Sequence, residues 1–218
     1  MQKWNEANKR LRQAGSARGF LFLLIVVIGC LYEGGHKIRT ALTNPHPTVM
    51  SYDAYAQARP DAQWLMLTNC QLNLFQASYL HHGDKTAQPN EYYVPVHGVG
   101  TPSGKTCVLL RTSDPDIMAT ANEIKALKTE SALLTWMSKN SARAFPKRNV
   151  QGVVSSGLDL RSSQREALEK VERENTTQDF IILQANAEPS LAAGVSFSAA
   201  GVAALFGLVV YARRKAAD

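Results

Sequence analysis

The 218-residue sequence lacks most of the signatures by which enzymes and disulfide-rich proteins are recognised. Its three cysteines are too few for a disulfide-stapled scaffold. No segment repeats with a period of about 20–50 residues, which excludes solenoids and propellers. There is no G-x-S-x-G nucleophile motif, no HExxH zinc motif and no spaced Cys/His pattern. We therefore predict that the protein is not an enzyme and has no cofactor.

The long middle part of the chain has almost no net charge. Of the formal +6, residues 1–18 contribute five Lys/Arg against one Glu, and residues 213–218 contribute three against one Asp. Residues 34–190 hold sixteen Lys/Arg and fifteen Asp/Glu. A nucleic-acid-binding protein concentrates its cations on the folded domain, so we predict no nucleic-acid partner. Basic tails beside apolar segments are typical of membrane topology instead.

A glycine-rich segment, residues 98–106, resembles a phosphate-binding loop but departs from the pattern in two ways. Val99 stands where the pattern requires its first glycine. The loop should also open a helix, whereas residues 107–110 (CVLL) predict a strand. We interpret the segment as a turn and expect no nucleotide partner.

Two apolar segments predict membrane-spanning helices. Leu191 to Tyr211 has no charged residue over 21 positions, and about 20 apolar residues suffice to cross a bilayer. Gly19 to Tyr32 is shorter, but the long side chains of Arg18 and Glu33 can reach the interface and extend it.

Three interpretations compete for the first apolar segment. We favour an uncleaved signal anchor. A cleaved signal peptide fits the basic and apolar regions, but no A-x-A-like site follows. Residues 27–30 (VIGC) also resemble a bacterial lipobox, which would make Cys30 a lipidation site. The second span makes a lipid anchor redundant.

The second span carries small residues at helical spacing, on two neighbouring faces. Small residues allow close helix–helix approach, with the first span or with another protein. The alternative is that alanine and glycine are simply common in such helices. The predicted packing residues are Ala192, Ser196, Ala199, Ala200, Ala203, Ala204 and Gly207.

The positive-inside rule then predicts a topology with both termini in the cytoplasm. Residues 1–18 form a basic cytoplasmic tail, 19–35 the signal anchor, 36–189 an extracytoplasmic domain, 190–212 the second span and 213–218 a second basic tail. The expected location is the bacterial inner membrane, with a periplasmic domain.

The segment between the spans predicts an α+β domain punctuated by Gly-, Pro- and Asn-containing turns. The glycines at 34–35 and the prolines at 45 and 47 predict a linker before it, and Pro95 predicts an edge strand. The predicted strands are residues 64–67, 71–79, 92–96, 106–112, 150–154 and 179–184. The predicted helices are residues 51–58, a helix from about 114 that continues or restarts after 129, and 163–175.

Two weak chemical candidates remain in this domain. His81, His82 and Asp84, with His97 nearby, have ligand types that bind zinc, but adjacent histidines on one loop seldom both point inward. Cys70 and Cys107 lie on predicted strands and would form either a disulfide or two buried free thiols.

Together these features predict a membrane-anchored, non-enzymatic accessory, assembly or scaffold subunit of a larger membrane complex. Its partners would be the lipid bilayer and other membrane proteins, or further copies of itself, bound through the domain and the second span. The alternative is a membrane-tethered metal-binding or hydrolytic domain that uses the loop of His81, His82 and Asp84.

Overall fold

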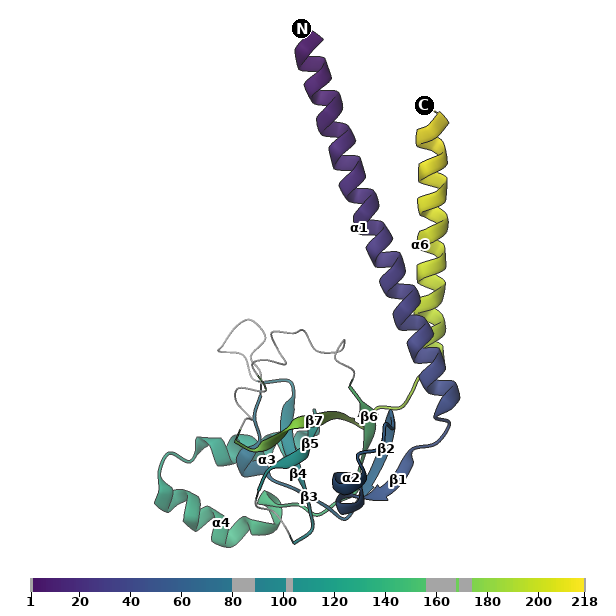
Figure 1. Ribbon diagram of the computed structural model, residues 1–218. Helices are drawn as coiled ribbons and strands as arrows, with labels where there is room; N and C mark the ends of the chain where they lie inside the picture. Colours follow the sequence, from purple (N-terminus) through teal and green to yellow (C-terminus); the bar gives the residue numbers. More distant parts are fainter. Residues whose placement is uncertain (1, 80–88, 101–103, 156–167, 169–173, 218) are drawn as a thin grey trace. The chain divides into compact units, whose positions relative to one another are not determined.

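The computed structural model describes residues 2–79, 89–100, 104–155, 168 and 174–217 (Figure 1). The chain divides into two compact units, which are described separately below. The first consists of residues 1–45 and 189–218 and is called the helical pair. The second consists of residues 46–188 and is called the central unit.

The helical pair is built from α1 (Gln2–Thr43) and α6 (Leu191–Ala217). Both apolar segments are therefore helical, as predicted, but α1 is much longer than its apolar part. The predicted linker at Gly34 and Gly35 is wrong, because α1 continues through both glycines and ends only before Asn44. Gly34 is buried against α6, so it serves close helix packing and does not end the helix.

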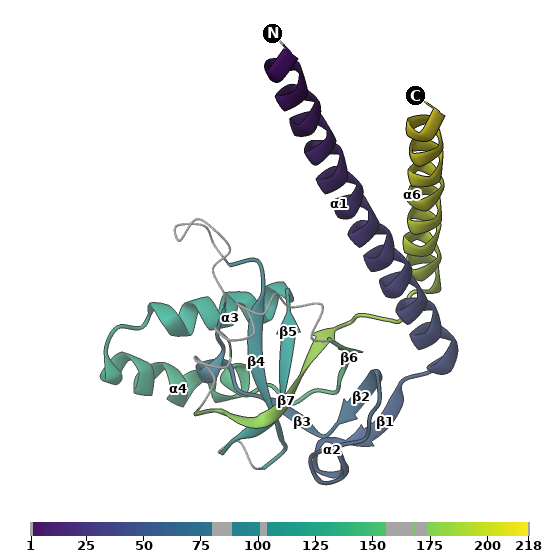
Figure 2. The ribbon, with the colours of Figure 1, turned by 45° about the horizontal axis from the view of Figure 1, so that its top comes forward.

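The central unit is a mixed α/β fold with one seven-stranded sheet, in the order β1-β2-β6-β7-β5-β4-β3 (Figure 2). The coarse fold class is thus confirmed. β1 pairs with β2, and β5 with β7, in parallel, while the other neighbours are antiparallel. The strands are β1 (Thr48–Ser51), β2 (Trp64–Thr68), β3 (Cys70–Leu72), β4 (Tyr92–Gly98), β5 (Thr106–Thr112), β6 (Val150–Val154) and β7 (Thr176–Ala185).

Two strand predictions are wrong. Residues 71–79 do not form one strand: β3 ends at Leu72, and a single 3₁₀ turn, η1 (Leu74–Gln76), follows. Asn73 caps that turn, since its side chain accepts the backbone N–H of Gln76. β4 is not an edge strand, because it lies between β5 and β3. Pro95 is tolerated inside the sheet because its carbonyl still accepts a bond from the Asn73 N–H.

Three helices of the central unit begin at side-chain caps. Ser51 caps α2 (Tyr52–Ala58), Asp114 caps α3 (Pro115–Ala126) and Thr129 caps α4 (Glu130–Ala144). The predicted restart after Thr129 is therefore correct. The predicted helix 163–175 lies almost entirely outside the described residues.

Side chains alternate between the two faces of the sheet, as the period of a strand requires. One face carries the larger core, where Leu72, Val94 and Val108 meet Tyr55 of α2 and Ile117 of α3. The opposite face carries a second cluster, which contains Tyr93, Leu109, Phe180, Ile182 and Leu168. β4 and β5 are therefore buried on both sides and form the centre of the packing.

The chain enters and leaves the sheet along one row of residues. Thr48, at the start of β1, pairs with Leu65, which pairs with Gly152, which pairs with Ala185 near the exit. β1 begins and β7 ends in that row, three strand spacings or about 14 Å apart. The start of β1 and the end of β7 therefore lie close together, although the two strands run parallel, so that the chain enters and leaves this row in the same direction.

Candidate functional site

The predicted histidine site cannot be assembled from the described residues. His81, His82 and Asp84 lie outside them, and His97 is buried near the end of β4, next to the edge strand β3. Its Nε2 has no hydrogen-bond partner among the described residues, and burial lowers the pKa of its imidazole. No group of three or more His, Cys, Asp or Glu in the described part of the chain could hold a metal.

Cys70 and Cys107 are two buried free thiols, the second of the two predicted alternatives. Cys70 lies on β3 and Cys107 on β5, with β4 between them. Two strand spacings amount to about 10 Å, which exceeds the distance of about 7 Å beyond which two cysteines cannot be bridged. The strand order therefore excludes the disulfide.

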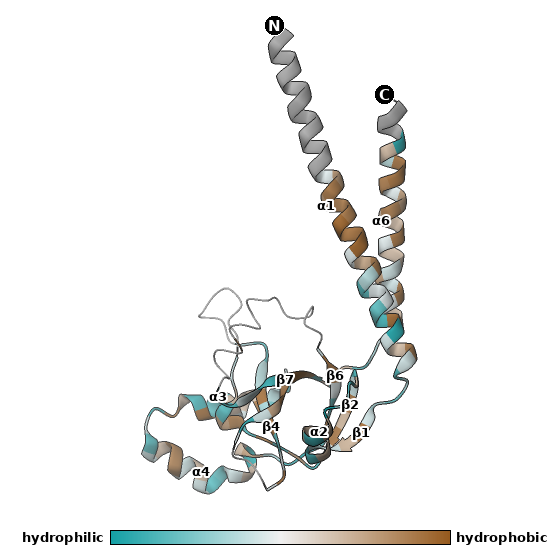
Figure 3. Ribbon diagram, in the orientation of Figure 1, coloured by the Kyte–Doolittle hydropathy of each residue, from teal (hydrophilic) through white to brown (hydrophobic). Residues whose placement is uncertain are grey.

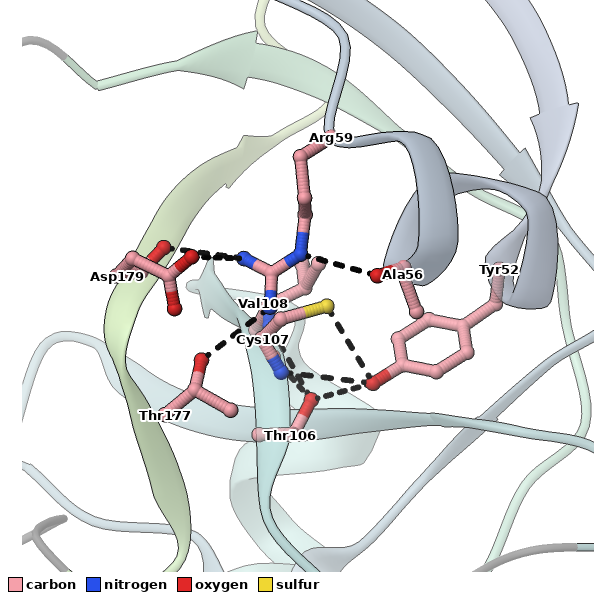
Figure 4. Close-up of polar contacts among 8 residues, drawn as sticks. All are labelled: Tyr52, Ala56, Arg59, Thr106, Cys107, Val108, Thr177 and Asp179. Carbon is pink, nitrogen blue, oxygen red and sulfur yellow. Dashed lines mark hydrogen bonds and ion pairs between the residues drawn. The ribbon is translucent and has the colours of Figure 1, made fainter.

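Cys107 belongs to a polar cluster that joins α2 to the sheet (Figure 4). The hydroxyl of Tyr52 lies 3.0 Å from the Thr106 hydroxyl and 3.7 Å from the Cys107 Sγ. The Thr106 hydroxyl donates in turn to the carbonyl of Val96 on β4. These contacts attach the first turn of α2 to β5 and β4.

Arg59, the residue that ends α2 about two turns further on, contacts an irregular part of β7. β7 shifts register against β5, since Thr106 pairs with Thr176 but Val108 with Ile181. The Arg59 guanidinium donates to the Asp179 carbonyl at 3.1 Å and lies 3.3 Å from the Asp179 carboxylate (Figure 4). At this register shift, the charged side chain of Arg59 contacts β7 where regular backbone pairing between β5 and β7 is interrupted.

This cluster has no reactive nucleophile. Burial raises the pKa of the Tyr52 phenol to about 12 and also raises the pKa of the Cys107 thiol. Burial likewise raises the pKa of Cys70 to about 12. A thiol acts as a nucleophile only as its thiolate, so both cysteines stay unreactive at neutral pH. The arrangement around Tyr52 is therefore structural.

The two helices of the helical pair pack closely, and glycines make this possible. A Cβ added to Gly34 would lie 2.6 Å from the backbone nitrogen of Ser198 on α6. One added to Gly194 would lie 2.8 Å from the backbone nitrogen of Ile38 on α1. One added to Gly201 would lie 2.9 Å from the Leu31 side chain. Backbone atoms lie in the way at positions 34 and 194, so only glycine permits the approach there, whereas at position 201 the neighbour is the Leu31 side chain, which can shift. We call this contact the glycine seam.

The seam follows a seven-residue repeat on both helices, which is the pattern of paired helices. On α6 its buried positions are Gly194, Gly201 and Leu208, and on α1 they include Val27 and Gly34. Sequence reasoning missed this seam because it followed the four-residue spacing of the more numerous alanines. The seven-residue spacing of the two glycines and Leu208 is the signal that would have found it.

Most of the predicted packing residues of α6 therefore lie outside the glycine seam. Ala204 is partly buried, whereas the other six predicted residues are exposed on α6: Ala192, Ser196, Ala199, Ala200, Ala203 and Gly207. Cys30 is partly buried at the seam, where its Cβ would lie 3.3 Å from a Cβ at position 201.

Both helices display large apolar side chains outside the seam, and Figure 3 shows the apolar stretch of each in brown. Phe22 is 67% exposed on α1, and Phe206 is 72% exposed on α6. The two helices are long and apolar enough to cross a membrane, over Gly19–Thr43 and Leu191–Arg213. Only 11% and 17% of their most apolar windows are buried, which is unlike the core helix of a soluble protein.

In comparisons with protein families, curated proteins and solved structures, nothing matches this chain.

Proposed function

We propose that the helical pair is a membrane hairpin and that the protein is a non-enzymatic accessory, assembly or scaffold subunit of a larger membrane complex. The observation that carries the proposal is the exposure of large apolar side chains around both helices of the pair. Each such side chain costs about 1.5–3 kcal/mol if it is left in water and not buried. Lipid removes that cost along the apolar stretch of each helix.

The glycine seam favours a hairpin of two packed membrane helices over two membrane anchors that do not contact each other. It closes α1 against α6 over Leu31, Gly34 and Ile38 without any large apolar side chain from α6 at Gly194 or Gly201. Packing through small residues is how helices associate in lipid, where there is no hydrophobic force between them. An uncleaved α1 fits this reading, because cleavage before Cys30 would remove Val27 from the buried side of the helix.

The basic tails give the proposed orientation, with both termini in the cytoplasm and the central unit outside it. For a bacterial cell this is the inner membrane with a periplasmic domain. The links on either side of the central unit are short, residues 44–47 and 186–190. They leave the sheet from one row, Thr48 to Ala185, so two short tethers would hold the central unit near the bilayer.

The proposed partner surface is the face of α6 that the seam leaves free. Small residues follow that face at three- and four-residue spacing, from Ala192 and Ser196 to Ala203 and Gly207. A further helix, from a partner or from a second copy, can approach closely there. The central unit would supply the contacts outside the membrane.

Native mass spectrometry of the full chain, extracted gently from its own membrane, tests this proposal. We expect a partner in fixed stoichiometry, and we expect that Ala203→Leu with Gly207→Leu releases it. Val202→Leu is the matched control, since Val202 is already large and exposed on another face of α6. A chain that is alone in the spectrum, or one that washes off membranes at alkaline pH, would contradict the proposal.

A further inference from the structure

A cavity of about 390 Å³ lies within the central unit, between α3 and the end of α4. Leu74, Ile117, Ala142 and Pro146 give it a partly apolar lining. Arg143 and Arg148 line it as well. Small-molecule sites commonly have this size and this combination of an apolar lining with a few converging polar groups.

Asp114 holds Arg148 in place at the cavity. One oxygen of Asp114 caps α3 by accepting the N–H groups of Asp116 and Ile117, at 3.0 and 3.4 Å. Its other oxygen accepts one guanidinium nitrogen of Arg148 at 3.1 Å. The backbone N–H of Arg148 also donates to the Cys70 carbonyl on β3. The remaining guanidinium N–H groups of Arg148 have no partner among the described residues.

A kink in α4 brings Arg143 to the same cavity. Asn140 has non-helical backbone angles (φ −129°, ψ 23°), and its side chain accepts a hydrogen bond from Arg143 at 3.3 Å. Arg143 donates from its other terminal nitrogen to Glu123 on α3 at 2.7 Å. Glu123 also accepts the Trp136 indole N–H at 2.7 Å. One carboxylate thus fastens α4 to α3 on both sides of the kink.

The Nε–H of Arg143 takes part in no hydrogen bond within the described chain. Both arginines are therefore oriented by one carboxylate each and still have donors to spare. Guanidinium groups bind carboxylates with two parallel hydrogen bonds. The Thr120 hydroxyl, which accepts from Arg143 at 3.5 Å, adds a third polar group that can donate at this wall.

We propose that the cavity between α3 and α4 binds a carboxylate on a short apolar body, with Arg143 and Arg148 holding the carboxylate and the apolar lining holding the body. The guanidinium donors that Arg143 and Arg148 leave unused within the described chain favour a carboxylate, and Asp116, the one carboxylate among the described lining residues, is exposed. Asp114 and Glu123 lie behind the arginines, so a singly charged anion is repelled less there than a phosphate dianion.

The same chemistry has two sources, a free small carboxylic acid and the C-terminal carboxylate of a partner polypeptide. Two pairs of probes distinguish recognition of the charge from burial of the apolar body, because the acid and the amide of a pair differ only in the charged group. The pairs are benzoate with benzamide, and acetyl-Ala-Leu with its C-terminal amide. Each is titrated by calorimetry into the full chain in mild detergent. This proposal does not depend on the membrane role of the helical pair.

We expect each bound acid to bind at least about tenfold more tightly than its amide, since hydrogen bonds to charged groups are worth about a factor of ten or more. Tighter binding of benzoate indicates a free acid, and tighter binding of the dipeptide indicates a polypeptide terminus. Equal binding of acid and amide, or binding of neither acid, would overturn the proposal.

Two arginine substitutions, Arg143→Leu and Arg148→Leu, each separately, should weaken the acid about tenfold without changing the amide. Lys139→Leu is the matched control, because it removes an exposed charge from the same helix outside the cavity. If Arg148→Leu does not fold, Arg148→Lys keeps the charge but loses the forked geometry and should still weaken the acid. Unchanged acid binding in the folded arginine variants would refute the site.

Discussion

Two adjacent glycines on α1 give a sharp test of the glycine seam. A Cβ at Gly34 would lie 2.6 Å from the Ser198 backbone nitrogen and 2.9 Å from the Gly194 carbonyl oxygen. A Cβ at Gly35 would meet no atom within 4 Å. Gly34→Ala and Gly35→Ala are the same chemical change at neighbouring positions of one helix. Their effects should have opposite signs.

The magnitude follows from helix propensity and packing. Alanine is more favourable than glycine inside a helix by about 0.8–1.0 kcal/mol, so Gly35→Ala should stabilise α1. At Gly34 the new methyl group meets backbone, which cannot rotate away, so α1 and α6 must separate by about 1 Å to reach a normal contact of about 3.5–4.0 Å. Overpacking of this kind costs about 1–3 kcal/mol. Both variants gain the same helix propensity, so they should differ by the overpacking cost alone, about 1–3 kcal/mol in the stability of the seam.

Cys30 provides the assay. A Cβ at position 201 would lie 3.3 Å from the Cys30 Cβ, close to the 3.5–4.5 Å of natural disulfides. Under mild oxidation the Gly201→Cys variant should form a disulfide between positions 30 and 201, which peptide mass mapping detects. Gly34→Ala should slow that reaction, whereas Gly35→Ala should not, and Ala203→Cys on an exposed face should not cross-link to Cys30. Equal cross-linking in the Gly34 and Gly35 variants would refute the seam.

Three further predictions concern the central unit. Burial lowers the pKa of His97, so the unfolded chain binds this proton first as the pH falls; stability should drop below about pH 6.5. Urea unfolding should show that His97→Leu removes this part of the acid sensitivity, and an unchanged pH profile would contradict it. Cys70 and Cys107 should resist maleimide at pH 8 until the chain is unfolded, because burial raises the pKa of both thiols; rapid labelling of the native chain would argue against their burial. Asp114→Ala should lower the unfolding free energy by about 0.5–2 kcal/mol through loss of the α3 cap, and an equally stable variant would show that the cap is dispensable.

The pKa of Asp114 extends the last prediction to acid. Burial alone would raise it, but hydrogen bonds from Arg148 and from the backbone of Ile117 and Asp116 outweigh burial and lower it. The folded state therefore favours the charged form, and the stability it adds at neutral pH is lost as the pH falls through the folded pKa. Asp114→Ala should remove that loss.

Local signals predicted many elements of the central unit. Asp114 and Pro115 mark the start of α3, and Thr129 marks the start of α4, because capping depends on neighbours in the sequence. The strand from Thr106 to Thr112 was predicted with its bounds for a similar reason, since the residues alternate or are continuously apolar between turns.

Other features depend on neighbours that the sequence does not reveal. Pro95 predicts an edge strand, but its neighbours on both sides are set by the strand order. The same order places β4 between Cys70 and Cys107, which no spacing along the chain discloses. Gly34 has the same residue type as Gly35, and only the position of α6 distinguishes a packing glycine from an exposed one. The cavity at Arg143 depends on the kink at Asn140, which carries no helix-breaking residue.

The row that joins Thr48 to Ala185 brings the two ends of the central unit close together, so the unit can be regarded as a domain inserted between α1 and α6. Domains whose two ends lie close together can be inserted into, or removed from, a host structure without breaking either one. Here the host is a pair of packed helices, and the first strand of the insert begins, and its last strand ends, in one row of a single sheet. A short loop in place of residues 46–188 should leave a hairpin with its glycine seam intact, so that anchoring and recognition could be exchanged independently of each other.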